Sequence, residues 1–190
     1  MEKHKHKISK ITMKTVQVGD RRFSLDIPSE KIKEQVKLVA AAINKDLAGK
    51  KPLFLVVLNG AFMFAADLLR EIEIPCEVSF VRVSSYEGTS STGKVKELIG
   101  LNENIEGRTL VVVEDIIDSG ITMREMLRML CEKNPADVRV ASLFVKPGNL
   151  QVELDIHYRC FDIANDFIVG YGLDYDQEGR NLPDIYRVCE

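Results

Sequence analysis

Apolar residues recur along the chain with two spacings, one typical of amphipathic helices and the other of buried strands. Between residues 32 and 47 they follow a period of about 3.6 residues, in a segment that opens at Pro28 and Ser29 and closes at Gly49. This pattern predicts a helix. Residues 53–58 are continuously apolar, which is typical of a strand that is covered on both faces.

The same alternation of helix and strand patterns continues toward the C-terminus. We expect further helices with the apolar faces Phe62, Ala66 and Leu69, and Met123, Met126, Leu127 and Leu130, and further strands at residues 77–83, 109–113, 138–145 and 167–171. Strands that alternate with helices predict an α/β fold, with a mostly parallel twisted sheet and helices on both of its faces. In such folds ligands bind beyond the carboxyl ends of the strands.

A polar stretch at residues 84–100 interrupts this pattern. It is rich in glycine and hydroxyl side chains, which predicts a long loop that serves as a lid or a binding loop. Gly88, Gly93 and Lys94 fit the G-x-x-x-x-G-K pattern of nucleotide triphosphatases. Val95, however, stands where a serine or threonine must reach magnesium, so a triphosphatase is the less favoured alternative.

Composition and charge are those of one soluble globular domain. Hydrophobic types make up 45% and charged types 29% of the 190 residues, which are ordinary proportions. We expect a single domain over residues 1–190, with residues 1–12 as a flexible tail. The net charge is −3 and the pI is about 5.7, which argues against a nucleic-acid partner.

The chain shows no pattern for membrane insertion, secretion or a thiol-bound metal. No apolar run approaches the roughly 20 residues of a membrane span, and the basic start lacks the apolar stretch of a signal peptide. We therefore expect a cytoplasmic protein with no membrane partner. The cysteines are widely spaced, so we expect isolated buried thiols. They are Cys76, Cys131, Cys160 and Cys189.

Candidate chemistry is concentrated where the strand at residues 109–113 runs into a small-residue turn and a helix. The backbone N–H groups from Asp118 to Ile121 should point outward at the start of this helix, where unpaired amides and the helix dipole attract a phosphate. The hydroxyls of Ser119 and Thr122 add donors. We expect Gly120 to let the backbone approach the ligand closely.

The acidic residues of this segment refine the expected ligand. Glu114, Asp115 and Asp118 would repel a bare polyphosphate, whereas carboxylates accept hydrogen bonds from the vicinal hydroxyls of a sugar. A ribose 5-phosphate would place its phosphate over residues 119–122 and its diol near Glu114 and Asp115. The alternative is that Asp118 and Ser119 only cap the helix while the other two acids are solvated.

The segment VVVEDIIDSGIT at residues 111–122 resembles the phosphoribosyl pyrophosphate signature of type I phosphoribosyltransferases. The chain after about residue 15 resembles one branch of them, the hypoxanthine-guanine phosphoribosyltransferases. Further matching motifs are LNG at residues 58–60, SSY at 84–86, VK at 145–146 and DFIVGYGLDYDQEGRNLP at 166–183. The resemblance implies the type I fold, with a small hood formed by the chain ends.

The resemblance also implies an activity in purine salvage. It is the transfer of the 5-phosphoribosyl group from phosphoribosyl pyrophosphate to N9 of hypoxanthine or guanine, which gives IMP or GMP and pyrophosphate in the presence of Mg²⁺. A homodimer or homotetramer is implied as well. The sequence does not rank hypoxanthine, guanine and xanthine.

The resemblance assigns roles to individual residues. Asp118 would accept the purine N7 proton, and Lys146 would donate to the purine O6. The remaining assignments are Glu114, Asp115, Asp118, Ser119, Gly120, Ile121 and Thr122 for the phosphoribosyl group, Phe167 and Ile168 with Lys146 for the purine, Asn59, Gly60 and Arg180 for pyrophosphate, Ser85 and Tyr86 for the lid loop, and Glu114, Asp115 and Asp174 for Mg²⁺.

Chemistry supports these residue types. A lysine ammonium is only a donor, so it matches a 6-oxopurine and not the 6-amino group of adenine. A closing lid would keep water from the cationic sugar. Taken singly, Lys146 could be a strand-end residue, Phe167 a core residue, and Asp174 with Arg180 a surface ion pair.

One departure from the family pattern and one rival function remain open. The family often has lysine in the middle of the 58–60 motif, where this chain has Asn59, so pyrophosphate affinity is in question. The peptide bond before that residue can be cis in family members. The rival function is a regulatory protein of the same fold that senses phosphoribosyl pyrophosphate and binds nucleic acid. The acidic pI disfavours it.

Overall fold

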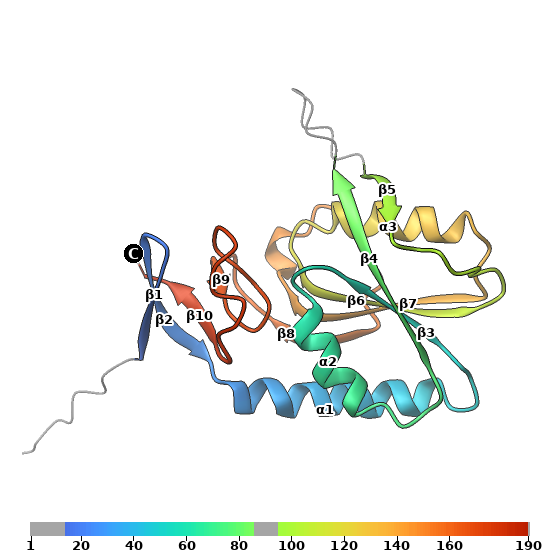
Figure 1. Cartoon of the computed structure of the whole chain (residues 1–190), viewed down its shortest axis with the longest axis horizontal. Helices are drawn as coiled ribbons and strands as arrows, with labels where there is room; N and C mark the ends of the chain where they lie inside the picture. The colour runs from blue at the N-terminus through green and yellow to red at the C-terminus, as the bar shows by residue number, and fades with distance from the viewer. Residues whose placement is uncertain (1–13, 86–94, 190) are drawn as a thin grey trace, which may run out of the picture.

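The computed structural model describes residues 14–85 and 95–189. In these residues the larger of two sheets has six strands in the order β5-β4-β3-β6-β7-β8 (Figure 1). The strands are β3 (Leu53–Val57), β4 (Glu77–Ser85), β5 (Val95–Ile99), β6 (Thr109–Ile117), β7 (Asp137–Val145) and β8 (Tyr158–Asp162). β3, β4, β6, β7 and β8 pair in parallel and β5 pairs antiparallel with β4. The expected mostly parallel α/β sheet is confirmed.

Helices cover both faces of this sheet, as the alternating pattern predicts. α1 (Ser29–Asp46) and α2 (Phe62–Arg70) pack on one face and α3 (Ile121–Cys131) on the other (Figure 1). Successive side chains of a strand point to opposite faces, so β3 contributes Phe54 and Val56 to the first core and Leu55 to the second. Among the described helices, none is long and apolar enough to cross a membrane.

The smaller sheet joins the two ends of the described chain. Its antiparallel order is β1-β2-β10-β9, with β1 (Thr15–Val18), β2 (Arg21–Ile27), β9 (Ile168–Val169) and β10 (Ile185–Val188). In Figure 1 it forms a separate lobe beside the main sheet, over the N-terminal end of α1. This lobe is the hood that the family resemblance implies, and we call it the hood from here on.

Two expectations about strands and loops are corrected, and others fall on residues outside the described ranges. The segment 167–171 does not add a strand to the main sheet, because only Ile168–Val169 is extended and it pairs with β10 in the hood. The polar stretch is not one long loop, because Ser84 and Ser85 belong to β4 and residues 95–99 form β5. Residues 86–94, with Tyr86 and the Gly88–Lys94 pattern, lie outside the described residues, as does the expected tail at 1–12.

Two expectations about side-chain burial are also corrected. The buried residues of α2 are Phe64, Ala65 and Leu68, not the expected face, and Phe62 is 39% exposed. Both sets of residues fit the helical period. Packing of α2 against β3 and β6 buries the set with Phe64, Ala65 and Leu68. Of the cysteines only Cys160 is buried. Cys131 is exposed at the end of α3, and the other two are partly buried.

Candidate active site

The loop between β6 and α3 lies at the carboxyl end of the central strand. Parallel pairing of β6 with β7 continues as far as Ile117, and α3 begins after Gly120, whose φ is +79°. A Cβ atom at Gly120 would lie 2.7 Å from Leu154 Cδ1 and 3.0 Å from Val152 Cγ2. The glycine is therefore required by its positive φ and by the chain packed behind the loop. Its expected close approach to a ligand stays a prediction, and Gly120 also lines the cavity beside the loop.

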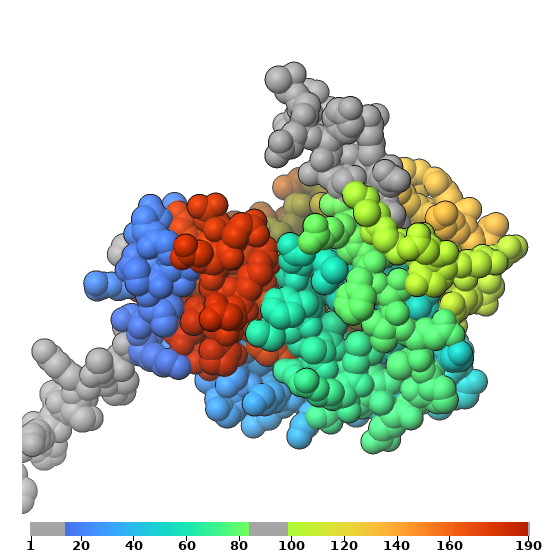
Figure 2. Space-filling view, viewed as in Figure 1, coloured from blue at the N-terminus to red at the C-terminus, as the bar shows by residue number. Residues whose placement is uncertain are grey.

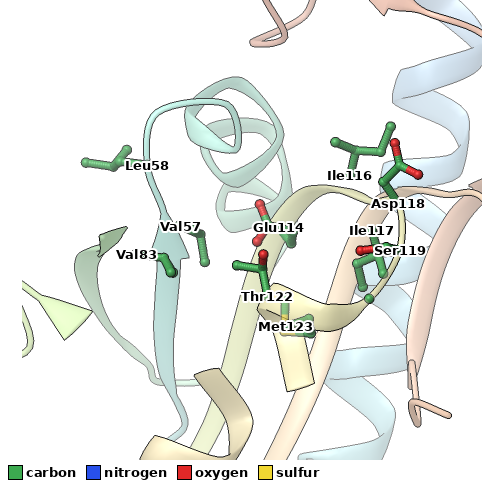
Figure 3. Close-up of a pocket in the computed structure, with 11 residues that line it drawn as sticks. Val57, Leu58, Val83, Glu114, Ile116, Ile117, Asp118, Ser119, Thr122 and Met123 are labelled. Carbon is green, nitrogen blue, oxygen red and sulfur yellow. The ribbon is translucent and has the colours of Figure 1, made fainter. Parts of the chain in front are cut away.

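A cavity of about 270 Å³ opens beside this loop, and we call it the turn cavity. Its lining residues are Val57, Leu58, Val83, Glu114, Ile116, Ile117, Asp118, Ser119, Gly120, Thr122 and Met123. Figure 3 shows the Glu114 carboxylate and the Thr122 hydroxyl directed into the same space, with Asp118 pointing away from both. The first N–H groups of a helix have no partner within it, so the start of α3 offers donors for an anion here.

The capping alternative holds only in part. The N-cap residue is Gly120, and no side chain caps α3. The Ser119 hydroxyl accepts a long hydrogen bond of 3.4 Å from the Ile121 N–H. Asp118 makes its contacts elsewhere, so it is not a helix cap.

Glu114 and Asp115 lie on opposite sides of β6, as neighbouring strand residues do. Glu114 lines the turn cavity, where burial raises the pKa of its carboxyl well above the usual value and the adjacent Asp115 charge raises it further. The Asp115 carboxylate lies against Gly60, where a Cβ atom would overlap it.

The Leu58–Asn59 peptide bond is cis. Asn59 is exposed, and its side-chain oxygen accepts a hydrogen bond of 2.6 Å from Arg82 Nη2.

A second cavity, of about 230 Å³, lies at the ends of β6, β7 and β9, and we call it the strand-end cavity. Its lining residues are Asp115, Ile116, Asp118, Lys146, Asp166, Phe167, Ile168, Leu173 and Asp174. Ile116 and Asp118 line the turn cavity as well. The structure thus places Asp118 on the boundary between a cavity with phosphate donors and a cavity with Lys146 and an aromatic ring.

Asp118 and Lys146 form an ion pair at this boundary. Lys146 is buried, with 8% of the residue exposed. Its ammonium lies 3.0 Å from Asp118 Oδ2 and 3.3 Å from Asn165 Oδ1. Asn149 Nδ2 donates to the other Asp118 oxygen. Partial burial raises the pKa of Asp118, but the hydrogen bonds from Asn149 and Lys146 outweigh burial, so the pKa lies below its usual value. The carboxylate is therefore ionised at neutral pH.

Phe167 is not a core residue, because it is 42% exposed at the strand-end cavity. Its ring packs edge-on against Tyr175 with a centroid distance of 5.7 Å, and Phe23 of β2 lies 6.3 Å away. The aromatic residues of the hood therefore hold the Phe167 ring in place, and the exposed part of the ring remains accessible to a flat ligand. Ile168 next to it is buried in β9.

Comparison with known proteins gives the family. The chain matches the phosphoribosyl transferase domain over residues 28–176. It belongs to the phosphoribosyltransferase family. A hypoxanthine-guanine phosphoribosyltransferase of Streptococcus thermophilus is 44% identical over 157 residues, which cover 82% of this chain and 87% of the relative. One of Streptococcus agalactiae is 45% identical over 152 residues, which cover 80% and 84%.

Solved structures agree with the sequence relatives. A hypoxanthine-guanine phosphoribosyltransferase of Bacillus anthracis, crystallised with a HEPES molecule in its active site, aligns with a TM-score of 0.82 at 38% identity and covers 92% of this chain and 99% of its own. A Trypanosoma cruzi hypoxanthine phosphoribosyl transferase aligns with a TM-score of 0.83 at 32% identity, covering 92% and 95%. The chain is therefore an enzyme of the phosphoribosyltransferase class of glycosyltransferases.

Two further residues of this phosphoribosyltransferase are paired with each other. Arg180 Nη2 lies 2.7 Å from Asp174 Oδ1, and Arg180 Nη1 donates to the Gly172 carbonyl at 2.8 Å. Asp174 lines the strand-end cavity. Arg180 lines a third cavity of about 560 Å³, which we call the hood cavity, with Gln17, Val18, Phe62, Met63 and residues 177–182. Arg180 is thus joined to the strand-end cavity through Asp174.

Three polar partners of the site residues were not predicted from the sequence. Asn149 and Asn165 both contact the Asp118–Lys146 pair, and Arg82 contacts Asn59. Lys146 is followed by proline, glycine and Asn149, a turn signal that could have brought Asn149 back toward the strand end. No local pattern indicates Asn165, whose position depends on the packing of β9.

Proposed function

We propose that this phosphoribosyltransferase transfers the 5-phosphoribosyl group from phosphoribosyl pyrophosphate to N9 of hypoxanthine or guanine, giving IMP or GMP and pyrophosphate. One observation carries the proposal. Asp118 lies between two cavities of different chemistry, with amide and hydroxyl donors in the turn cavity and Lys146 and Phe167 in the strand-end cavity. A ligand made of a phosphate, a sugar and a flat base matches this order.

The purine would lie in the strand-end cavity, with its ring on Phe167. Lys146 donates to the purine O6, and the ionised Asp118 accepts the N7 proton as N9 attacks the sugar. The base enters between Lys146 and Asp118, so their hydrogen bond of 3.0 Å is exchanged for two bonds to the ligand. Adenine presents amino hydrogens to an ammonium that can only donate, so adenine is a poor substrate.

The phosphoribosyl group would lie in the turn cavity. Its phosphate accepts hydrogen bonds from the N–H groups of residues 119–122 and from the hydroxyls of Ser119 and Thr122. Its ribose hydroxyls donate to Glu114 and Asp115. Cleavage at C1 builds positive charge on the sugar, and a fixed carboxylate such as that of Asp115 would stabilise this charge.

Mg²⁺ fits the donors of the strand-end cavity. Asp115 and Asp174 present carboxylates there, with Glu114 on the other side of β6. Within residues 14–85 and 95–189 no cluster of three or more His, Cys, Asp or Glu side chains could hold a metal ion alone. Mg²⁺ typically binds one or two carboxylates together with substrate phosphates. Asp115 and Asp174 would therefore suffice as the protein ligands. When bound there, Mg²⁺ would supply positive charge that offsets the charge of the leaving pyrophosphate.

Pyrophosphate would be bound by Arg180 and by the backbone N–H groups of Asn59 and Gly60. Gly60 touches the loop that carries Arg180, since a Cβ atom at Gly172 would overlap the Gly60 carbonyl. Ser85, at the end of β4, stands at the start of the proposed lid. Asn59 carries no charge, so the cation for pyrophosphate comes from the loop of Arg180.

The assembly proposed is a homodimer or homotetramer. Val78 and Phe80 are 40% and 51% exposed, although their register with Phe54 and Val56 places them on the sheet face that α1 and α2 cover elsewhere. Figure 2 shows the surface on which β4 is exposed beside α2. A second copy would bury this apolar strip. Light scattering should show a dimer or larger, and a monomer at micromolar concentration would contradict the assembly.

The activity is tested with purified protein, phosphoribosyl pyrophosphate and each of hypoxanthine, guanine, xanthine and adenine, with and without Mg²⁺. We expect IMP from hypoxanthine and GMP from guanine, both dependent on Mg²⁺, and little product from adenine. Absence of nucleotide product from every base would overturn the proposal. If salt-sensitive binding to RNA or DNA accompanied that absence, the sensor function would replace it.

A further inference from the structure

Asn149 holds the Asp118 oxygen that Lys146 does not reach. Its side-chain Nδ2 donates to Asp118 Oδ1, while the Lys146 ammonium lies 3.0 Å from Oδ2. An ionised carboxylate can only accept hydrogen bonds, so the Asn149 side chain must present its nitrogen here.

We propose that Asn149 is a positioning residue, which keeps the Asp118 carboxylate oriented toward N7 when the purine separates Asp118 from Lys146. The inference rests on the proposed function. Purine binding replaces the bond at Oδ2, because Lys146 turns to O6 and N7–H takes its place. The bond from Asn149 to Oδ1 does not need to change, so Asp118 is held by one partner throughout the exchange.

Backbone hydrogen bonds on both sides of Asn149 fix its position. The Lys146 N–H donates to the Ile117 carbonyl at 3.0 Å, and the Gln151 N–H donates to the Ser119 carbonyl at 2.9 Å. Asn149 ends the 3₁₀ turn Pro147–Asn149 between these two anchors. The turn is thereby tied to the residues on either side of Asp118, and the amide is held in place before the purine arrives.

The other half of the pair has a matching partner. Lys146 Nζ lies 3.3 Å from Asn165 Oδ1, which remains available as an acceptor when Lys146 gives up Asp118. Each charged group therefore keeps one neutral amide partner in the presence of purine. An orientation that is fixed in advance lowers the cost of reaching the reactive geometry.

The test compares Asn149→Ala and Asn149→Asp with wild type in single-turnover formation of IMP. The alanine variant removes the donor. The aspartate variant keeps the shape but replaces the donor with a negative acceptor. We expect a loss in the single-turnover rate of about tenfold for alanine and more for aspartate, with the KM for phosphoribosyl pyrophosphate within about twofold of wild type. Gln151→Ala, in the same segment with an exposed side chain, should match wild type.

Each contrary result has a definite meaning. Wild-type rates in both Asn149 variants would overturn the inference, and so would an aspartate variant that is faster than alanine, because shape and not donation would then matter. An equal rise in the KM for hypoxanthine and in the KM for phosphoribosyl pyrophosphate would also overturn it. A residue that positions Asp118 toward N7 should leave the binding of phosphoribosyl pyrophosphate unchanged. Wild-type protein that forms no IMP would instead overturn the proposed function itself.

Discussion

Replacing Lys146 with methionine isolates the group that is assigned to the purine O6. The Lys146 ammonium lies 3.0 Å from Asp118 Oδ2 and 3.3 Å from Asn165 Oδ1, in a side chain that is 10% exposed. Methionine keeps most of the length and apolar volume and removes the charge and the three donors. The substitution therefore tests one hydrogen bond to the base with little change in packing.

The expected effect is large for the purine and small for the other substrate. A hydrogen bond to a charged group contributes about 1.5–3 kcal/mol, and each 1.4 kcal/mol is tenfold in affinity. The KM for hypoxanthine should rise about 10- to 150-fold. The KM for phosphoribosyl pyrophosphate should stay within about threefold of wild type. Lys146 does not line the turn cavity, so the substitution removes no contact to that substrate there.

Stability should change little, because the Asp118 side chain is 47% exposed and water can solvate it once Lys146 is gone. Such half-exposed pairs contribute about 0–1 kcal/mol. Steady-state kinetics with each substrate varied in turn, together with thermal denaturation, make the assay. Lys31→Met, on the exposed face of α1, is the control. An unchanged hypoxanthine KM, or equal increases for both substrates, would refute the reasoning.

Three further substitutions test other parts of the site and fold. Asp118→Asn should lower turnover about 10- to 1,000-fold and leave the Kd of phosphoribosyl pyrophosphate nearly unchanged; unchanged turnover removes its role as proton acceptor. Gly60→Ala should displace the Asp115 carboxylate and raise the KM for phosphoribosyl pyrophosphate about tenfold, and an unchanged KM would exclude Asp115 from that site. Hydrogen bonds from Lys14 and a backbone N–H hold the pKa of Asp184 below its usual value. Asp184→Ala should therefore cost about 1–2 kcal/mol at pH 7, and this difference from wild type should shrink as the pH falls below about 4; a pH-independent difference would contradict the assignment.

The main sheet could be predicted from sequence because its central strands are buried on both faces. β3 is a continuous apolar run, β6 contains one from Leu110 to Val113, and β7 is buried from Val140 to Val145. The buried residues of α1 follow the helical period. β5 could not be recognised in this way. It is an edge strand in a polar stretch, and its existence depends on antiparallel pairing with β4.

The hood was implied by resemblance and not by pattern. β2 pairs with β10, a contact between distant parts of the chain, and neither strand has the continuous apolar run that marks the main sheet. Long-range pairing of this kind leaves little trace in local sequence. Phe62 shows the same limit for helices, because two faces of α2 fit one period and only the tertiary contact selects between them.

Within the site, the sequence predicted the residues that share one segment better than the contacts between segments. The turn after β6 and its donors follow from a strand, a glycine and a helix in succession. The contact between Asn149 and Asp118 joins two different loops, so it depends on where the fold places each loop. Gly120 was predicted to allow a close approach to the ligand, and the structure adds the chain packed behind the loop as a second reason for a glycine.

The location of the bound nucleotide is the most direct test of the account. Crystals of the protein with IMP should show the phosphate at the N–H groups of residues 119–122, the base on Phe167, O6 facing Lys146 and N7 facing Asp118. A nucleotide bound in the hood cavity beside Phe62, with the turn cavity left to solvent, would contradict the assignment of the phosphate and purine positions.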